Sequence, residues 1–447
     1  MSHYMEVKMK FKTWLLAAAC TMFLTPSMIF GYQATFTPRI SVGAEYKDNI
    51  FQTDDDLIPK QDEYITSISP GFTAELLGKN SGVNISYDPK YVMYDEYEEN
   101  DGWRHDARLK GWAEISKNTR LDLRDRFRLT EDRLSESDIA YLRVQEPDDI
   151  IDNTRRTGRN EYYRNNASVN LLHQFGEFDT FNLGYRHYFL ENDDPTDEDK
   201  KRNNPYAELT YWFVHDWGFN LRGDYIRGEY DVSSDYDQIN ARARLVKKFS
   251  RLLNGFIQFG YATLDYDEER REDADGYDLS AGFDYKIAAD ISLLFVAGYS
   301  YLDRDISDDE SGVSGNVKLT KTLSRGVIYL TGSGGYKGPN FGSDTRGVSE
   351  FYEAGGSVRY QLAKHLSGNA FGSYRYDDYL ENPFGLEEKT TKAGLGLEVQ
   401  ALKWMSLGLN YNFRSFDSTR DVEDYDENRV FFRVTLSPSV PFRTSQY

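Results

Sequence analysis

Apolar and polar residues alternate along most of this chain, in segments of about ten residues. In residues 119–129 the odd-numbered positions include Leu121, Leu123, Phe127 and Leu129. The even-numbered positions, the other parity, are Arg120, Asp122, Arg124, Arg126 and Arg128. The same pattern recurs in residues 104–115, 207–213, 239–245, 279–285 and 430–436. Successive side chains of a β-strand point to opposite faces, so the pattern predicts strands with one apolar and one polar face.

The length of these segments separates two kinds of sheet. A soluble antiparallel sheet also alternates, but its strands are usually about 5–6 residues long. A tilted membrane strand needs about 9–11 residues, which fits the segments here. We therefore expect an all-β protein, a transmembrane antiparallel β-barrel.

The connections between the segments support the barrel, because short and long ones alternate strictly. The short ones fall at residues 78–80, 117–118, 176–177, 216–217, 250–251, 289–290, 324–325, 364–365 and 403–404, with long polar loops between them. Short periplasmic turns and long outer loops are typical of outer-membrane barrels. Nine turns predict about 20 strands, within a range of 16–20, from about residues 35–48 to about residues 428–439, with both termini periplasmic.

The N-terminal segment predicts export. Lys8, Lys10 and Lys12 precede an apolar run at residues 14–24, followed by small or apolar residues ending at Gly31. This is the order of a Sec-type signal peptide, whereas a membrane anchor would need about 20 apolar residues. We expect residues 1–31 to be the signal peptide and residues 32–447 to form the barrel, in the outer membrane of a Gram-negative cell. Cys20, the only cysteine, lies in the signal segment, and whether it is ever lipidated stays open.

Composition and charge narrow the possible partners. The 447 residues include 34 Tyr, 27 Phe and 6 Trp, too many aromatics for a disordered chain. The formal net charge of −20 disfavours nucleic acid. Most of the excess acid lies in the loops at residues 191–202, 265–278, 303–310 and 417–427. These loops are either simply solvated or bridged by divalent cations to outer-membrane lipopolysaccharide.

The predicted lumen carries the opposite charge. The candidate anion path consists of Arg104, Arg108, Lys110, Arg120, Arg124, Arg126, Arg128, Arg242 and Arg244. Arginine presents a planar fork that suits carboxylate, sulfate or phosphate, and many weak sites in series allow release. The alternative is an arginine–acid network that braces the wall. Asp125 falls on the outward parity, which predicts either a nearby bulge or a position at the membrane interface.

Other features are less specific. The longest loop, residues 130–160, is either an inward constriction or an outer lid, and tyrosines near strand ends suggest aromatic girdles. The six histidines lack metal-ligand spacing, and no nucleophile elbow, Walker loop or dinucleotide fingerprint occurs. We expect no enzyme activity, no metal site and no cofactor.

Two short motifs carry a family resemblance. Residues 46–51, Tyr-Lys-Asp-Asn-Ile-Phe, are similar to a Tyr-x-Asp-Asn-Val-Phe motif, and residues 68–72, Ile-Ser-Pro-Gly-Phe, resemble its x-x-Pro-Gly-Leu partner. On these residues the chain resembles the outer-membrane β-barrel porin 2 family, which is found in exopolysaccharide loci. The resemblance implies an outer-membrane barrel and a conduit for polysaccharide, and it brings no catalytic residues.

Three functions follow from these expectations. The first is a channel that exports an anionic exopolysaccharide together with periplasmic export partners. The second is a passive porin for small anions. The third is a closed structural or adhesive surface barrel.

Overall fold

The computed structural model describes residues 32–54, 57–131, 160–195, 197–268, 271–337, 347–380, 385–420 and 423–444. The predicted signal peptide with Cys20, and residues 132–159 of the longest loop, lie outside the described residues, so the predictions for them remain untested.

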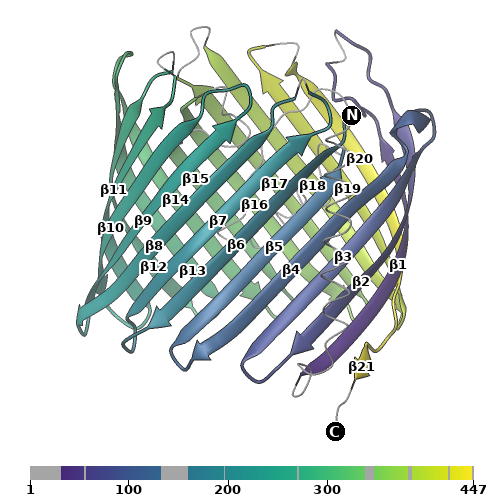
Figure 1. Ribbon diagram of the computed structural model, residues 1–447, viewed down its shortest axis with the longest axis horizontal. Coiled ribbons are helices and arrows are strands. Elements are labelled where there is room, and N and C mark those ends of the chain that lie inside the picture. Colours follow the sequence, from purple (N-terminus) through teal and green to yellow (C-terminus); the bar gives the residue numbers. More distant parts are fainter. Residues whose placement is uncertain are drawn as a thin grey trace.

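The described residues form a closed antiparallel barrel of twenty long strands (Figure 1). The strands are β1 Gln33–Lys47, β2 Glu63–Leu77, β3 Ser81–Tyr94, β4 Gly102–Ser116, β5 Thr119–Thr130, β6 Tyr162–Gln174, β7 Thr180–Asn192, β8 Lys200–Val214, β9 Trp217–Tyr230, β10 Tyr236–Lys248, β11 Leu253–Tyr266, β12 Ala274–Ala288, β13 Ile291–Arg304, β14 Glu310–Leu323, β15 Gly326–Lys337, β16 Ser349–Ala363, β17 Leu366–Tyr379, β18 Leu386–Leu402, β19 Met405–Ser418 and β20 Tyr425–Leu436. A short 3-10 helix, η2 Glu98–Asn100, lies between β3 and β4.

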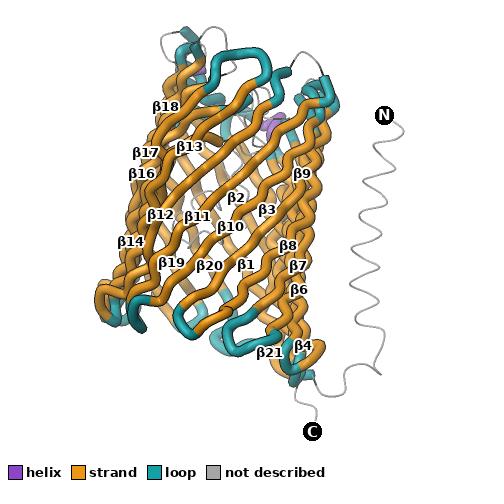
Figure 2. Tube along the Cα trace, turned by 90° about the vertical axis from the view of Figure 1, so that its left-hand side faces the viewer, coloured by secondary structure: helices purple, strands orange, loops and turns teal. Residues whose placement is uncertain are grey.

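Each strand pairs with its neighbours in the chain, and β1 closes the cylinder by pairing with both β2 and β20. The nine expected turns all fall between described strands and lie together at one end of the cylinder, the turn end, while the longer connections lie at the other, the loop end (Figure 2). The predicted fold class and strand number are therefore confirmed. β1 begins and β20 ends at the turn end, and the periplasmic side of that end stays a prediction.

The chain adds one pairing that the alternation does not predict. After β20, Pro438 and Pro441 lack the N–H that a continuing strand needs, and the pairing with β1 is interrupted. The chain then forms the short strand β21, Phe442–Thr444, which pairs with residues 34–36 of β1.

The two faces of the barrel divide as the alternation predicts. Large apolar side chains such as Leu279, Leu395 and Val313 point outward, with exposed fractions of 61%, 62% and 65%. Charged and small polar residues share the inward parity. A water-soluble protein hides such apolar side chains, so this surface suits lipid. Within the described residues, no helix is long and apolar enough to cross a membrane.

The Tyr-Lys-Asp-Asn-Ile-Phe motif fastens the seam between the first and last strands. The Asn428 backbone N–H and side-chain amide each donate to the Asp48 carboxylate at 2.6 Å. The Asn49 amide donates to the Asp426 carbonyl at 2.9 Å. Ile50, only 1% exposed, then packs with an apolar cluster on β2 and β3. The motif thus joins β1 to β20 at the loop end.

Candidate anion path in the lumen

The strand register brings the predicted basic residues of β4 and β5 together on the inner wall. Arg108 lies directly opposite Arg126, and Lys110 lies opposite Arg124. Residues in such pairs have Cβ atoms about 4.5–5.5 Å apart, so their charges act on one another. Lys110 and Arg124 are also exposed to the lumen. These two side chains are therefore best placed to meet a passing anion.

Asp106 gathers the arginines nearer the loop end. It accepts bonds from Arg108 at 2.9 and 3.0 Å and from Arg126 at 2.7 Å, and Arg128 lies 3.6 Å away. One carboxylate thus holds three guanidinium groups together on the inner wall. This part of the predicted path stabilises the wall and gathers arginines on it.

Two members of the predicted set lie at the ends of the cluster. Arg104, 5% exposed, is held at the loop end by Glu131 at 2.6 Å and Glu161 at 3.5 Å, so it ties strand ends together. Arg120 is exposed at the turn end, where Asp122 accepts its bonds at 2.9–3.0 Å.

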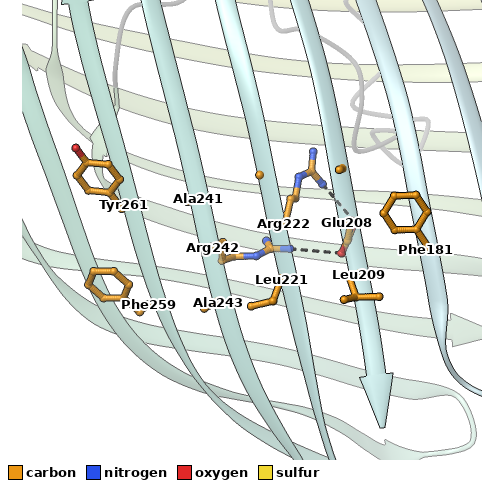
Figure 3. Close-up of a pocket in the computed structure, with 12 residues that line it drawn as sticks. Phe181, Glu208, Leu209, Leu221, Arg222, Ala241, Arg242, Ala243, Phe259 and Tyr261 are labelled. Atoms are coloured by element: carbon orange, nitrogen blue, oxygen red, sulfur yellow. Dashed lines mark ion pairs between the residues drawn. The ribbon is translucent and has the colours of Figure 1, made fainter.

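A second basic group lies on β8–β10, around the predicted residues Arg242 and Arg244. Arg242 is opposite Arg222, and Glu208 lies 3.7 and 3.8 Å from them (Figure 3). Arg244 donates from Nε and Nη2 to the side-chain Oε1 of Gln258, at 3.0 and 2.6 Å. Asp224 also lies 3.9 Å from Arg222, so three arginines share two carboxylates and an amide.

Tyr206 also belongs to this group, although it is not among the predicted site residues. Its ring lies between Arg186, at 4.5 Å, and Arg222, at 5.3 Å, and its hydroxyl donates to Asn170 at 2.8 Å. The girdle prediction covers most strand-end tyrosines, with a minority left to face the lumen and stack on sugar rings, and Tyr206 is not among the tyrosines considered. The signal was available in the alternation, because Tyr206 has the opposite parity to Ala207 and Leu209.

The opposite wall differs in chemistry. The inward positions of β12–β19 include many small, uncharged residues: Gly276, Ser280, Gly282, Ser292, Gly298, Ser300, Gly312, Ser314, Asn316, Thr320, Thr331, Ser333, Gly355, Ser357, Asn369, Ser373, Gly394, Gly396, Asn410 and Asn412. Where acids and bases occur on this wall they are more evenly matched, as Arg375 is with Glu353 and Asp377. Among the described residues, Arg and Lys therefore gather on one side of the lumen, β4–β10 (the basic side), and the facing side is near-neutral.

The two ends of the lumen also differ. At the loop end an apolar cluster joins the ends of β9–β13 to the segment before β16; its buried members are Ile226, Tyr230, Tyr236, Leu264, Ala274, Leu302 and Val348. Tyr236 is 0% exposed. At the turn end the inward Arg120, Lys318 and Glu398 are exposed. The lumen is thus more tightly packed at the loop end.

Lys337, the last residue of β15, lies on the inward parity at this packed end. The outward side chain at the same level is Glu350, so Lys337 lies beyond the apolar band. Burial, followed by the nearby Arg375, lowers the pKa of Lys337 to about 8. Within the described part of the chain, no hydrogen bond or ion pair of Lys337 is found.

The side chain of Asp125 points outward, as its place in the alternation predicts. Pairing between β4 and β5 is continuous around it, and the register shift between these strands lies at residues 114–116. No bulge therefore turns Asp125, and its partner is the outward Asn165. Within the described residues, no group of three or more His, Cys, Asp or Glu is arranged to hold a metal ion.

Comparison with known proteins finds likeness in fold. No protein-family model and no curated protein sequence matches the chain. A mutant of the ferric enterobactin receptor PfeA from Pseudomonas aeruginosa aligns with 10% identity and a TM-score of 0.50, over 90% of this chain and 80% of that one. OccAB4 from Acinetobacter baumannii aligns with 14% identity and a TM-score of 0.41, over 93% and 100%. The outer membrane protein OpdK from Pseudomonas aeruginosa aligns with 11% identity and a TM-score of 0.43, over 90% and 99%.

The likeness is one of fold alone. At 10% identity the PfeA alignment supports a β-barrel of this general size, and it assigns no substrate. The resemblance to the porin 2 family stays a prediction that rests on the two short motifs.

Proposed function

We propose that the chain is an outer-membrane channel that exports an anionic exopolysaccharide along the basic side of its lumen. The observation that carries the proposal is the uneven inner wall, with paired cations such as Lys110 and Arg124 on β4 and β5. The apolar outer face supports the membrane location.

The spacing of the cations suits a polymer that carries repeated acidic groups. Alternate residues of one strand are roughly 6–7 Å apart, so Arg124 and Arg126 place two closely spaced positive charges along the wall, with Arg128 buried behind them. A carboxylate leaving one guanidinium finds the next within reach. Many weak sites in series favour both entry and exit.

The near-neutral wall suits the remaining surface of a glycan. Ser, Thr and Asn side chains exchange hydrogen bonds with hydroxyl groups. A small-anion porin would need the cations but not this wall.

A closed structural barrel is the second candidate, and one observation favours it. The apolar cluster around Tyr236 packs the loop end in the described conformation. An exporting channel must loosen this cluster when substrate passes, whereas a closed barrel would keep it.

Planar bilayers distinguish these candidates. Purified protein should give channels that prefer anions across a salt gradient, and an acidic oligosaccharide should block them at lower concentration than a neutral one of equal length. Absence of channels would favour the closed barrel. Equal block by both sugars would favour a simple anion porin.

A further inference from the structure

The outward surface of β5–β8 carries four polar side chains, two of which, Asp125 and His187, lie at the level of the apolar band. The four are Asp125 on β5, Asn165 on β6, His187 on β7 and Asn203 on β8. We call these four residues the polar patch. Along the strands, Asp125 lies between the outward Leu123 and Phe127.

The patch is held in place by its own hydrogen bonds. The Asn165 amide donates to Asp125 at 2.7 Å. The side-chain Oδ1 of Asn203 accepts a hydrogen bond from the Tyr185 hydroxyl at 2.6 Å and lies 3.0 Å from His187 Nδ1. Among the described residues, Asn165 is the only side chain found to hydrogen-bond Asp125. The carboxylate therefore keeps acceptor capacity that faces away from the barrel.

The rest of the apolar band shows how unusual this sector is. On β20 the outward residue as far from the loop end as Asn165 and Asn203 is also polar, Asn428, whereas Val430 and Phe432 lie at the depth of Asp125 and His187. On β13 the outward residues at that depth are Tyr299 and Ala297. A carboxylate or imidazole facing hydrocarbon is unfavourable, and such residues usually face protein or water instead. The patch thus requires a polar partner within the membrane.

The arrangement of charge points to the identity of that partner. In the register Asp125 is opposite Ala167, and Ala167 is opposite His187. Two strand spacings, roughly 10 Å, keep the acid from the imidazole of its own chain. A second copy turned by a two-fold rotation brings its His187 toward Asp125 and its Asp125 toward His187. The small Ala167 between them allows close approach.

We propose that the polar patch of one chain binds the same patch of a second copy, forming a two-fold dimer within the membrane. The proposal rests on the membrane location proposed above and not on the transported substrate. An interface of this isologous kind brings a residue near the axis against its own counterpart.

Cysteine cross-linking tests the dimer. In a full-length Cys20→Ser background, Ala167→Cys places one thiol at the centre of the patch. Val317→Cys, on the outward face of β14, is the matched control. We expect a short bis-maleimide, applied to intact membranes, to link Ala167→Cys into a species of twice the monomer mass and to leave Val317→Cys monomeric. Equal linking of both variants, or of neither, would overturn the proposal.

A second variant separates the dimer from a lipid-facing carboxylate. In the dimer, Asp125→Leu removes the acid that faces the partner's His187, so Ala167→Cys cross-linking should fall severalfold. If Asp125 faces lipid, the same change should leave cross-linking unaltered and raise the unfolding temperature, which would contradict the dimer. Channel recordings made in parallel report on the proposed function, so failure of one proposal is recognisable without failure of the other.

Discussion

Reversing the charge of Lys110 and Arg124 is the sharpest test of the basic wall. The two residues are directly opposite on β4 and β5 and are exposed to the lumen. In the variant Lys110→Glu with Arg124→Glu, each site changes by two charges. Because neither residue is an observed partner of Asp106, the arginine bonds to that carboxylate should survive.

The size of the effect follows from Coulomb's law. An anion about 6 Å from each charge, in a water-filled lumen, gains roughly 0.7 kcal/mol per cation. Reversal at both sites removes roughly four times that amount, and screening in about 0.1 M salt leaves about half, or ~1.5 kcal/mol. We therefore expect the local preference for anions to fall about tenfold, since ~1.4 kcal/mol is a factor of ten.

The assay is the reversal potential in a tenfold potassium chloride gradient, where perfect selectivity for one monovalent ion gives about 59 mV. We expect the variant to move by tens of millivolts toward cation preference, with heat-modifiable gel migration confirming the fold. The matched control is Lys318→Glu with Arg359→Glu, an equal charge change on the near-neutral wall. Unchanged selectivity in the first variant, or equal shifts in both, would refute a preferred path along β4 and β5.

Three further predictions concern the seam, the packed end and Lys337. Asp48→Ala should lower the temperature of heat modification, because it removes two hydrogen bonds from Asn428 to a carboxylate, each worth about 1.5–3 kcal/mol. An unchanged temperature would mean that these bonds do not stabilise the pairing of β1 with β20. Tyr236→Ala should raise single-channel conductance by thinning the loop-end cluster, and unchanged conductance would place the narrowest point elsewhere. The pKa of Lys337 is about 8 in the folded chain and 10.5 ordinarily. Between these pH values the unfolded chain binds one more proton than the folded chain. The free energy of unfolding should therefore rise with pH over this range, by about 3 kcal/mol. Lys337→Met should abolish that rise in urea titrations, and persistence of the rise would assign it to other groups.

The fold was predictable because alternation and turn spacing are local properties of the chain. The parity of Leu121, Leu123 and Phe127 predicted the outward face of β5, whereas the bulge offered as one explanation of Asp125 is absent. The break after β20 could not be read from alternation, since it depends on prolines beyond the strand.

The chemistry of the wall was predictable only in part. Parity placed the arginines inward, but the register between two strands decides which of them share Asp106. The buried ion pair of Arg104 could not be predicted, because its partner Glu131 lies beyond the end of β5. The polar patch also needed the register, which aligns Asp125, Ala167 and His187 across three strands.

Export of an acidic glycan is tested most directly in proteoliposomes that contain the purified chain. Labelled oligouronate and neutral oligosaccharide of equal length are enclosed together, and the release of each is followed over time. The account predicts faster release of the oligouronate, and loss of that preference in the Lys110→Glu and Arg124→Glu variant. Equal release of both sugars, or retention of both by a correctly folded barrel, would contradict it.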